Sequence, residues 1–199
     1  MPTAAELTVK INTVLDEQGF DRTEKRITDF TAIGQGMVGV GLAIGAGFGA
    51  AVMQAANFEQ ADKVVVHKSE RRLELLKNGK VLRSFRVALG LAPEGDKLRE
   101  GDFRTPEGRY LLLDRNPDSD YFLSIRISYP DERHQRAARA RGHAPGGLIM
   151  IHGMPNEPRY SAEYYRTMDW TNGCIAVSNA DMIDIWLMTA RNTPIDILP

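Results

Sequence analysis

The sequence predicts a domain that is mainly β with a few helices (α+β), extending over residues 61–199. Short apolar and alternating runs recur throughout this region, whereas one segment alone has clear helical periodicity. The best-defined element is a hairpin at Asn78-Gly79, a pair that favours the positive φ angles of a tight turn. Apolar residues make up 43% of the chain and charged residues 26%, which indicates a globular protein rather than a disordered one.

Eight segments of this region have the length and pattern of strands. In chain order they are 64–66, 72–77, 80–89, 108–113, 122–128, 148–152, 174–177 and 195–198. One helix is expected near the end of the chain. Ser178 or Asn179 can cap it, and Met182, Ile185 and Trp186 contribute to its apolar side.

The region before residue 61 has a different composition. Residues 1–32 form a polar segment with one short expected helix, whereas residues 33–56 are 24 uncharged residues that include seven glycines. This length suits a bilayer span, and glycines four apart permit close helix packing in lipid. We therefore expect a helical membrane anchor at 33–56. A cleaved signal peptide and a glycine-rich buried segment remain the alternatives.

Charge and cysteine content exclude several classes of function. The net charge of −1 provides no general attraction for nucleic acid, so no nucleic-acid partner is expected. Cys174 is the single cysteine, which rules out an intramolecular disulfide and any zinc site built from several cysteines.

A histidine and the cysteine are placed for thiol chemistry. The apolar run 148–151 ends on His152, and Cys174 begins the apolar run 175–177, so the two can face each other on adjacent strands. In that arrangement His152 acts as the general base for the Cys174 nucleophile, whose pKa is expected to be lowered. Gly173 lets backbone amides approach a substrate carbonyl closely.

Together these residues resemble a known signature. Ile151-His152-Gly153 followed by the run 171–179 is similar to the His-Gly and Ser/Thr-x-Gly-Cys motifs of the YkuD-domain L,D-transpeptidases. Further motifs at 87–90, 105–110 and 145–147 occur in the same order and resemble the YafK-like branch of that family. The resemblance covers about residues 63–199.

The resemblance implies a β-rich catalytic domain that acts on peptidoglycan stem peptides of the meso-diaminopimelate type. It implies a thioester on Cys174, with His152 as the base and the amides of Gly173 and Cys174 around the oxyanion. It implies no metal and no organic cofactor. Gly153, Asn172 and Thr171 are expected to support this site. The same acyl-enzyme could instead be resolved by water, which would make the protein an L,D-amidase or carboxypeptidase that can also release wall-linked protein. The substrate implies an inner-membrane-anchored enzyme with a periplasmic domain, or one secreted to the periplasm.

Two positions depart from the family pattern. Asn172 stands where many members have a second histidine, and Ala176 where many have an arginine that could bind a substrate carboxylate. A basic cluster can compensate as a lid over the cleft, and a solvated loop helix with no role in the site is the alternative. Its members are Arg133, Arg136, Arg139 and Arg141, and the first three would share one face of a helix.

Overall fold

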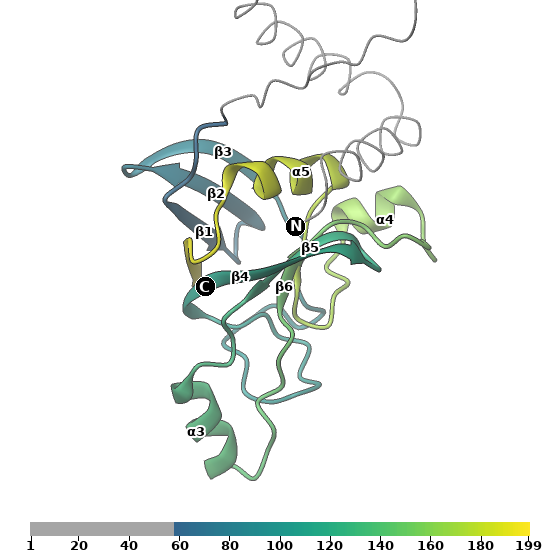
Figure 1. Ribbon diagram of the computed structural model, residues 1–199. Coiled ribbons are helices and arrows are strands. Elements are labelled where there is room, and N and C mark those ends of the chain that lie inside the picture. Colours follow the sequence, from purple (N-terminus) through teal and green to yellow (C-terminus); the bar gives the residue numbers. More distant parts are fainter. Residues whose placement is uncertain (1–57) are drawn as a thin grey trace, which may run out of the picture. The chain divides into compact units, whose positions relative to one another are not determined.

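The computed structural model describes residues 58–199, so the expected segments at 1–32 and 33–56 lie outside the described range. Within 58–199, no helix has both the length and the apolar character needed to cross a membrane. The described domain contains eight strands and three helices (Figure 1), which confirms the prediction of a β-rich domain with a few helices.

The eight strands belong to one sheet with the order β3-β2-β1-β8-β4-β5-β6-β7. Their bounds are β1 (Lys63–His67), β2 (Arg72–Lys77), β3 (Lys80–Arg86), β4 (Gly108–Ser119), β5 (Phe122–Ile127), β6 (Met150–His152), β7 (Ile175–Ala176) and β8 (Pro194–Leu198). Each corresponds to one of the eight expected segments. The hairpin prediction is confirmed, because Asn78 and Gly79 both have positive φ angles, of 50° and 76°.

Two features connect the parts of this sheet. The long strand β4 pairs with β8 along residues 108–111 and with β5 from Leu112 onward. After β3 the chain continues to β7, where Ala88 and Ala176 exchange two backbone hydrogen bonds of 2.8 Å. The segment after β3 therefore covers the outer edge of β7, the strand that Cys174 immediately precedes.

The expected C-terminal helix is α5 (Asn179–Met188), which packs against β5. Ser178 is its N-cap, since its side chain accepts a hydrogen bond from the Asp181 amide. Met182 and Ile185 are fully buried on its inner side.

Two shorter helices lie in the connections. The segment that carries the arginines forms α3 (Glu132–Ala140), at the opposite end of the domain from α5 (Figure 1). The connection between β6 and β7 contains α4 (Ala162–Thr167), which the sequence analysis did not anticipate.

Candidate active site

His152 and Cys174 lie on adjacent parallel strands. His152 is the last residue of β6 and is opposite Ala176 in β7, while Cys174 immediately precedes β7. Side chains of a strand alternate between its faces, so Cys174, Ala176 and His152 share one face. His152 and Cys174 also line the same cavity, of about 330 Å³. The structure therefore brings together the two residues that the sequence singled out.

The imidazole of His152 is held in one orientation. It is 4% exposed, and its Nδ1 lies 2.7 Å from the Gly153 carbonyl oxygen, to which it donates. This hydrogen bond leaves the lone pair on Nε2. Burial lowers the pKa of His152 to about 4, although the bond to Gly153 opposes the shift. The ring is therefore neutral at pH 7 and can accept a proton.

Gly153 itself is fixed by close packing. Its amide lies 3.1 Å from two carbonyl oxygens, that of Leu123 in β5 and that of Tyr121 in the turn before β5. A Cβ atom at this position would come within 2.6 Å of Asn179 Oδ1, which accepts a hydrogen bond from the Met154 amide. A side chain at residue 153 would displace the carbonyl that orients His152.

The turn before Cys174 is shaped by Thr171 and Gly173. The Thr171 hydroxyl donates to the Cys174 carbonyl oxygen at 2.7 Å and accepts from the Gly173 amide at 3.1 Å. Gly173 has a φ of 124°, and a Cβ atom there would lie 2.6 Å from the Arg104 carbonyl oxygen. Glycine is required at this position by conformation and by space.

This turn changes the expected set of oxyanion donors. The Gly173 amide is engaged by Thr171 inside the turn, so it is not directed at a substrate. The Cys174 amide has no acceptor among residues 58–199 and remains the backbone donor next to the thiol.

The prediction of a lowered thiol pKa is wrong. Burial raises the pKa of Cys174, and this effect exceeds the opposing influence of the Met150 backbone and of the Lys97 charge. The thiol lies 3.6 Å from the Leu148 carbonyl oxygen, which can accept its proton in a weak hydrogen bond. The resting pair is therefore a neutral thiol beside a neutral imidazole.

One wall of the cavity was not foreseen from the sequence. It comes from the end of β4, the turn after it and the start of β5, and its residues are Asn116, Asp118, Ser119, Asp120, Tyr121 and Ser124. The other walls include Trp170, Thr171 and Asn172. The one signal in the sequence was a polar, turn-like run at 116–120, which carries no chemical motif. Ala176 is buried and is not among the lining residues.

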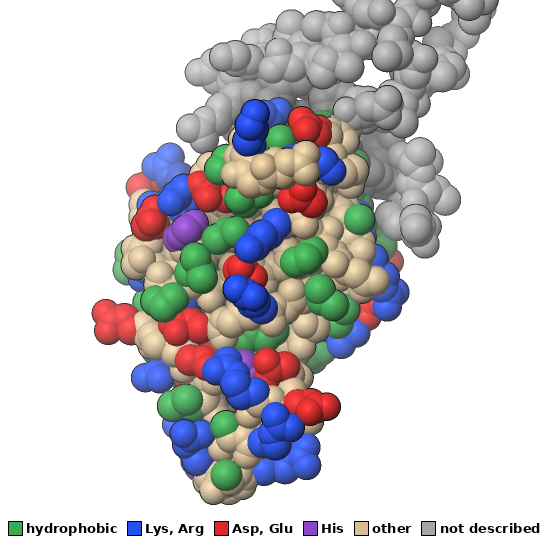
Figure 2. Space-filling model, turned by 90° about the vertical axis from the view of Figure 1, so that its left-hand side faces the viewer, with side chains coloured by type: hydrophobic (Ala, Val, Ile, Leu, Met, Phe, Trp, Pro, Cys, Tyr) green, Lys and Arg blue, Asp and Glu red, His purple; other side chains and the backbone are tan. Residues whose placement is uncertain are grey.

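The arginine cluster does not line this cavity. Arg133 borders a separate hollow of about 340 Å³ that shares no lining residue with the first. The other three interact along α3, where Arg136 pairs with Glu132, Arg139 donates to Gln135 and Arg141 donates to the Ala137 carbonyl oxygen. Figure 2 shows basic side chains gathered toward the lower end of the domain, the end at which Figure 1 places α3.

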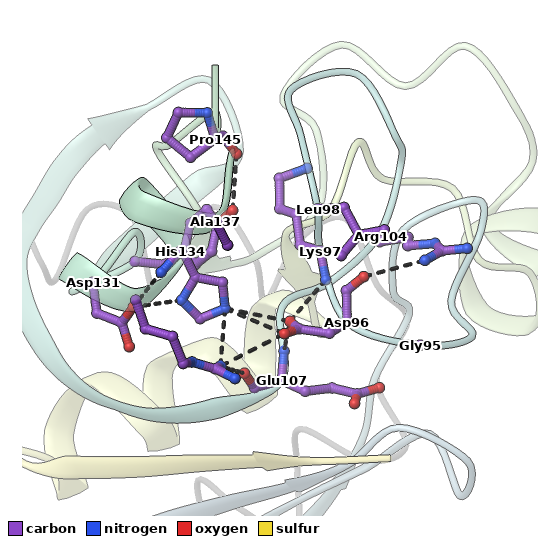
Figure 3. Close-up of polar contacts among 12 residues, drawn as sticks. Gly95, Asp96, Lys97, Leu98, Arg104, Glu107, Asp131, His134, Ala137 and Pro145 are labelled. Carbon is purple, nitrogen blue, oxygen red and sulfur yellow. Dashed lines mark hydrogen bonds and ion pairs between the residues drawn. The ribbon is translucent and has the colours of Figure 1, made fainter. Parts of the chain in front are cut away.

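A polar network around His134 holds α3 in place (Figure 3). Its Nδ1 lies 2.6 Å from Asp131 and its Nε2 lies 3.3 Å from Asp96, with the Tyr110 hydroxyl also at 3.3 Å. Asp96 belongs to the long connection between β3 and β4, so the network ties α3 to that connection. No group of three or more potential metal ligands is assembled among residues 58–199.

Comparison with known proteins gives a consistent result. Residues 61–197 match the family model of the YkuD L,D-transpeptidase catalytic domain. An Escherichia coli protein described as the L,D-transpeptidase YafK is 37% identical to this chain over 97 residues. That match covers 45% of this chain and 37% of YafK.

A solved structure is also similar. The helical cell shape determining protein Pgp2 from Campylobacter jejuni is 26% identical, with a TM-score of 0.52. The match covers 68% of this chain and 46% of Pgp2. The chain thus spans less than half the length of these relatives.

Proposed function

Because the chain belongs to the YkuD family of L,D-transpeptidase catalytic domains, we propose that it transfers peptidoglycan stem peptides through a thioester on Cys174. The observation that supports this most directly is the shared cavity of His152 and Cys174, with the histidine tautomer set by Gly153. The substrate class is that of the family, a stem peptide with meso-diaminopimelate. The catalytic roles below are part of the proposal.

In the first half-reaction the Cys174 sulfur attacks the carbonyl carbon of diaminopimelate as His152 Nε2 takes the thiol proton. The negative charge that develops on the carbonyl oxygen is stabilised by the Cys174 amide. When the intermediate collapses, the C–N bond breaks and the imidazolium protonates the departing amine. The products are a thioester and a free amine, and His152 is neutral again.

In the second half-reaction a neutral amine of another stem peptide attacks the thioester carbon. His152 removes a proton from this amine, the C–S bond breaks, and the proton passes to the sulfur. An amide cross-link forms and the thiol is regenerated. Thr171, Gly153 and Gly173 serve this cycle by fixing the turn and the imidazole, and Asn172 lines the cavity.

The decisive experiment supplies a donor tetrapeptide with and without a second stem peptide and identifies the products by mass. Cross-linked dimers are expected from the wild-type protein and none from Cys174→Ala. Tripeptide without dimers would mean that water resolves the thioester, and unchanged substrate would contradict the proposed function.

We further propose that the domain works in the periplasm, where this substrate is found, and that residues 33–56 anchor it. The similarity to Pgp2 supports a role in wall remodelling and cell shape. A reporter fused after Pro199 should be active outside the cytoplasm, and the protein should resist carbonate extraction. Activity of the reporter in the cytoplasm alone, or complete extraction, would contradict the anchor.

A further inference from the structure

Two polar atoms in the cavity wall have no protein partner. Ser124 Oγ and Trp170 Nε1 are both buried, and neither makes a hydrogen bond with any described residue. Ser124 is 1% exposed and lies directly opposite His152 in the pairing of β5 with β6. Buried polar groups are normally paired, because leaving one unpaired is destabilising. Since both residues line the cavity, a bound peptide can supply the missing partners.

The same wall is acidic. Asp118 and Asp120 line the cavity, and within residues 58–199 no lysine or arginine lines it. His152 adds no positive charge, because it is neutral at pH 7. The charge of Lys97 reaches the Cys174 thiol, but Lys97 lies outside the lining and pairs with Asp102 at 2.7 Å. The wall therefore favours a cation over a carboxylate.

Aromatic rings add to this preference. Tyr121 and Trp170 line the cavity beside the carboxylates, and their rings stack with centroids 6.1 Å apart. The faces of such rings attract ammonium groups. Carboxylates and aromatic faces thus provide two sources of attraction for the same kind of ligand.

The acidic turn is held in a defined shape. The Asn156 side chain donates to the Ser119 carbonyl oxygen and accepts from the Phe122 amide, both at 3.0 Å. Within the turn, Asn116 Oδ1 accepts from the Asp118 amide at 3.0 Å and Ser119 Oγ accepts from the Tyr121 amide at 3.1 Å. These bonds fix the backbone that carries the two carboxylates before a ligand binds.

We propose that the wall formed by Asp118, Asp120, Ser124 and Trp170 is a recognition subsite for a primary ammonium group of the peptide substrate. The carboxylates bind the ammonium group, while Ser124 and Trp170 complete their hydrogen bonds with polar atoms of the same peptide. This inference rests on the proposed function for the nature of the substrate. An acidic subsite differs from the arginine lid considered in the sequence analysis, because arginines would have bound carboxylates.

Two amines of the substrates have this chemistry. The donor diaminopimelate carries one at the far end of its side chain, and the acceptor stem carries the amine that attacks. Carboxylates keep a bound amine protonated, and a protonated amine has no lone pair for attack. The subsite therefore suits an amine that stays unreacted, which is that of the donor.

The test compares two donor tetrapeptides, one with the free side-chain amine and one in which that amine is acetylated. Thioester formation on the full chain is followed by mass without an acceptor. Wild type should form the thioester about tenfold more efficiently with the free-amine donor than with the acetylated donor. This is the effect expected from one charge-assisted hydrogen bond at an exposed rim. The double variant Asp118→Asn, Asp120→Asn should lose this preference. Asp114→Asn removes one carboxylate from the strand that carries Asp118 but outside the cavity, and it should keep the preference.

The outcomes separate the two proposals. Equal reaction of wild type with both donors would overturn the subsite. So would a preference for the free amine that the double variant keeps. Failure of wild type to react with either donor would contradict the proposed function instead.

Ser124→Ala tests the unpaired hydroxyl separately. Removing a buried group that has no protein partner should leave the melting temperature unchanged or raise it, while thioester formation falls about three- to tenfold. Trp170→Phe should behave similarly in thioester formation. A lower melting temperature with unchanged thioester formation would show that Ser124 supports the fold and not the substrate.

Discussion

His134 and His152 are both buried, at 6% and 4% exposure, and both lie against two aromatic rings. They differ in their hydrogen bonds. His134 has carboxylates at both ring nitrogens, from Asp131 and Asp96, whereas His152 is held at Nδ1 alone. Among the described residues, Nε2 of His152 has no hydrogen-bond partner. Burial alone therefore does not identify a catalytic histidine, and an unused ring nitrogen in a cavity is the more informative feature.

The regions around the two histidines differ in the same way. Beside His134, Lys68 pairs with Glu107 and Lys97 pairs with Asp102, both nearly fully buried lysines. Beside His152, the hydroxyl of Ser124 and the indole of Trp170 have no hydrogen-bond partner among residues 58–199. Polar groups near His134 therefore stabilise the fold by pairing with one another. The two groups near His152 do not, and this difference is what the proposed subsite rests on.

The largest expected effect is on catalysis at His152. His152→Ala should slow acylation of Cys174 by a carbapenem about 10²- to 10⁴-fold, the usual contribution of a general base. Labelling is measured by mass, and Cys174→Ala should take up no label. A loss of less than about tenfold would mean that another group removes the thiol proton.

His134→Ala should act on stability instead. It leaves the carboxylates of Asp131 and Asp96 and the Tyr110 hydroxyl without their shared partner, at a cost of about 2–4 kcal/mol. Denaturant unfolding measures this change. Acylation per folded molecule should stay within about twofold of wild type. A selective loss of acylation would show that the two regions are not functionally separate.

The pH dependence sharpens the comparison further. With a pKa of about 4, His152 stays mostly neutral at pH 5, so the acylation rate should change little between pH 7 and pH 5. A histidine with an ordinary pKa of 6.5 would lose about 25-fold over that range. A decline centred near pH 6.5 would contradict the neutral, buried base.

The same shift has a consequence for folding. The His152 imidazole binds a proton near pH 6.5 in the unfolded state and only near pH 4 in the folded state. Its contribution to the free energy of unfolding is therefore fully present above pH 6.5 and is lost as the pH falls toward 4. The loss is on the order of 3 kcal/mol. His152→Ala should remove this part of the pH dependence of unfolding.

Much of this architecture was accessible from the sequence. The strands follow from local patterns, and Asn78-Gly79 sets the register beside its turn, where Lys77 is opposite Lys80. Further along the hairpin the register shifts between Leu75 and Leu76, which the turn does not predict. His152 and Cys174 could be paired because each adjoins an apolar run, and these runs became β6 and β7. The short helix α4 was missed because six residues carry too little periodicity to be distinguished from a loop.

Features that depend on distant packing were not accessible. The acidic wall reaches the site because β5 pairs with both β4 and β6, which brings Asp118 near His152 although 34 positions separate them. The raised pKa of Cys174 reflects burial, which a motif does not reveal. The arginines lie in α3 or at its end, but their three-residue spacing could not say where in the domain a helix would lie.

The smallest expected effect is at the arginines of α3. Arg136 is 72% exposed and its pair with Glu132 spans one helical turn at 3.0 Å, so Arg136→Ala should cost less than about 0.5 kcal/mol of stability. Arg139 donates to Gln135 at a similarly exposed position, and Arg139→Ala should be comparable. If the cavity at His152 recognises the peptide through Asp118 and Asp120, the double variant Arg136→Ala, Arg139→Ala should react with the donor tetrapeptide within about twofold of wild type. Raising the salt concentration should then weaken donor binding in wild type and in this variant alike, because the carboxylates at the rim remain in both. A tenfold loss of donor reactivity in the double variant, with unfolding unchanged, would instead mean that α3 reaches the substrate, and the basic end of the domain would have to be counted as part of the site.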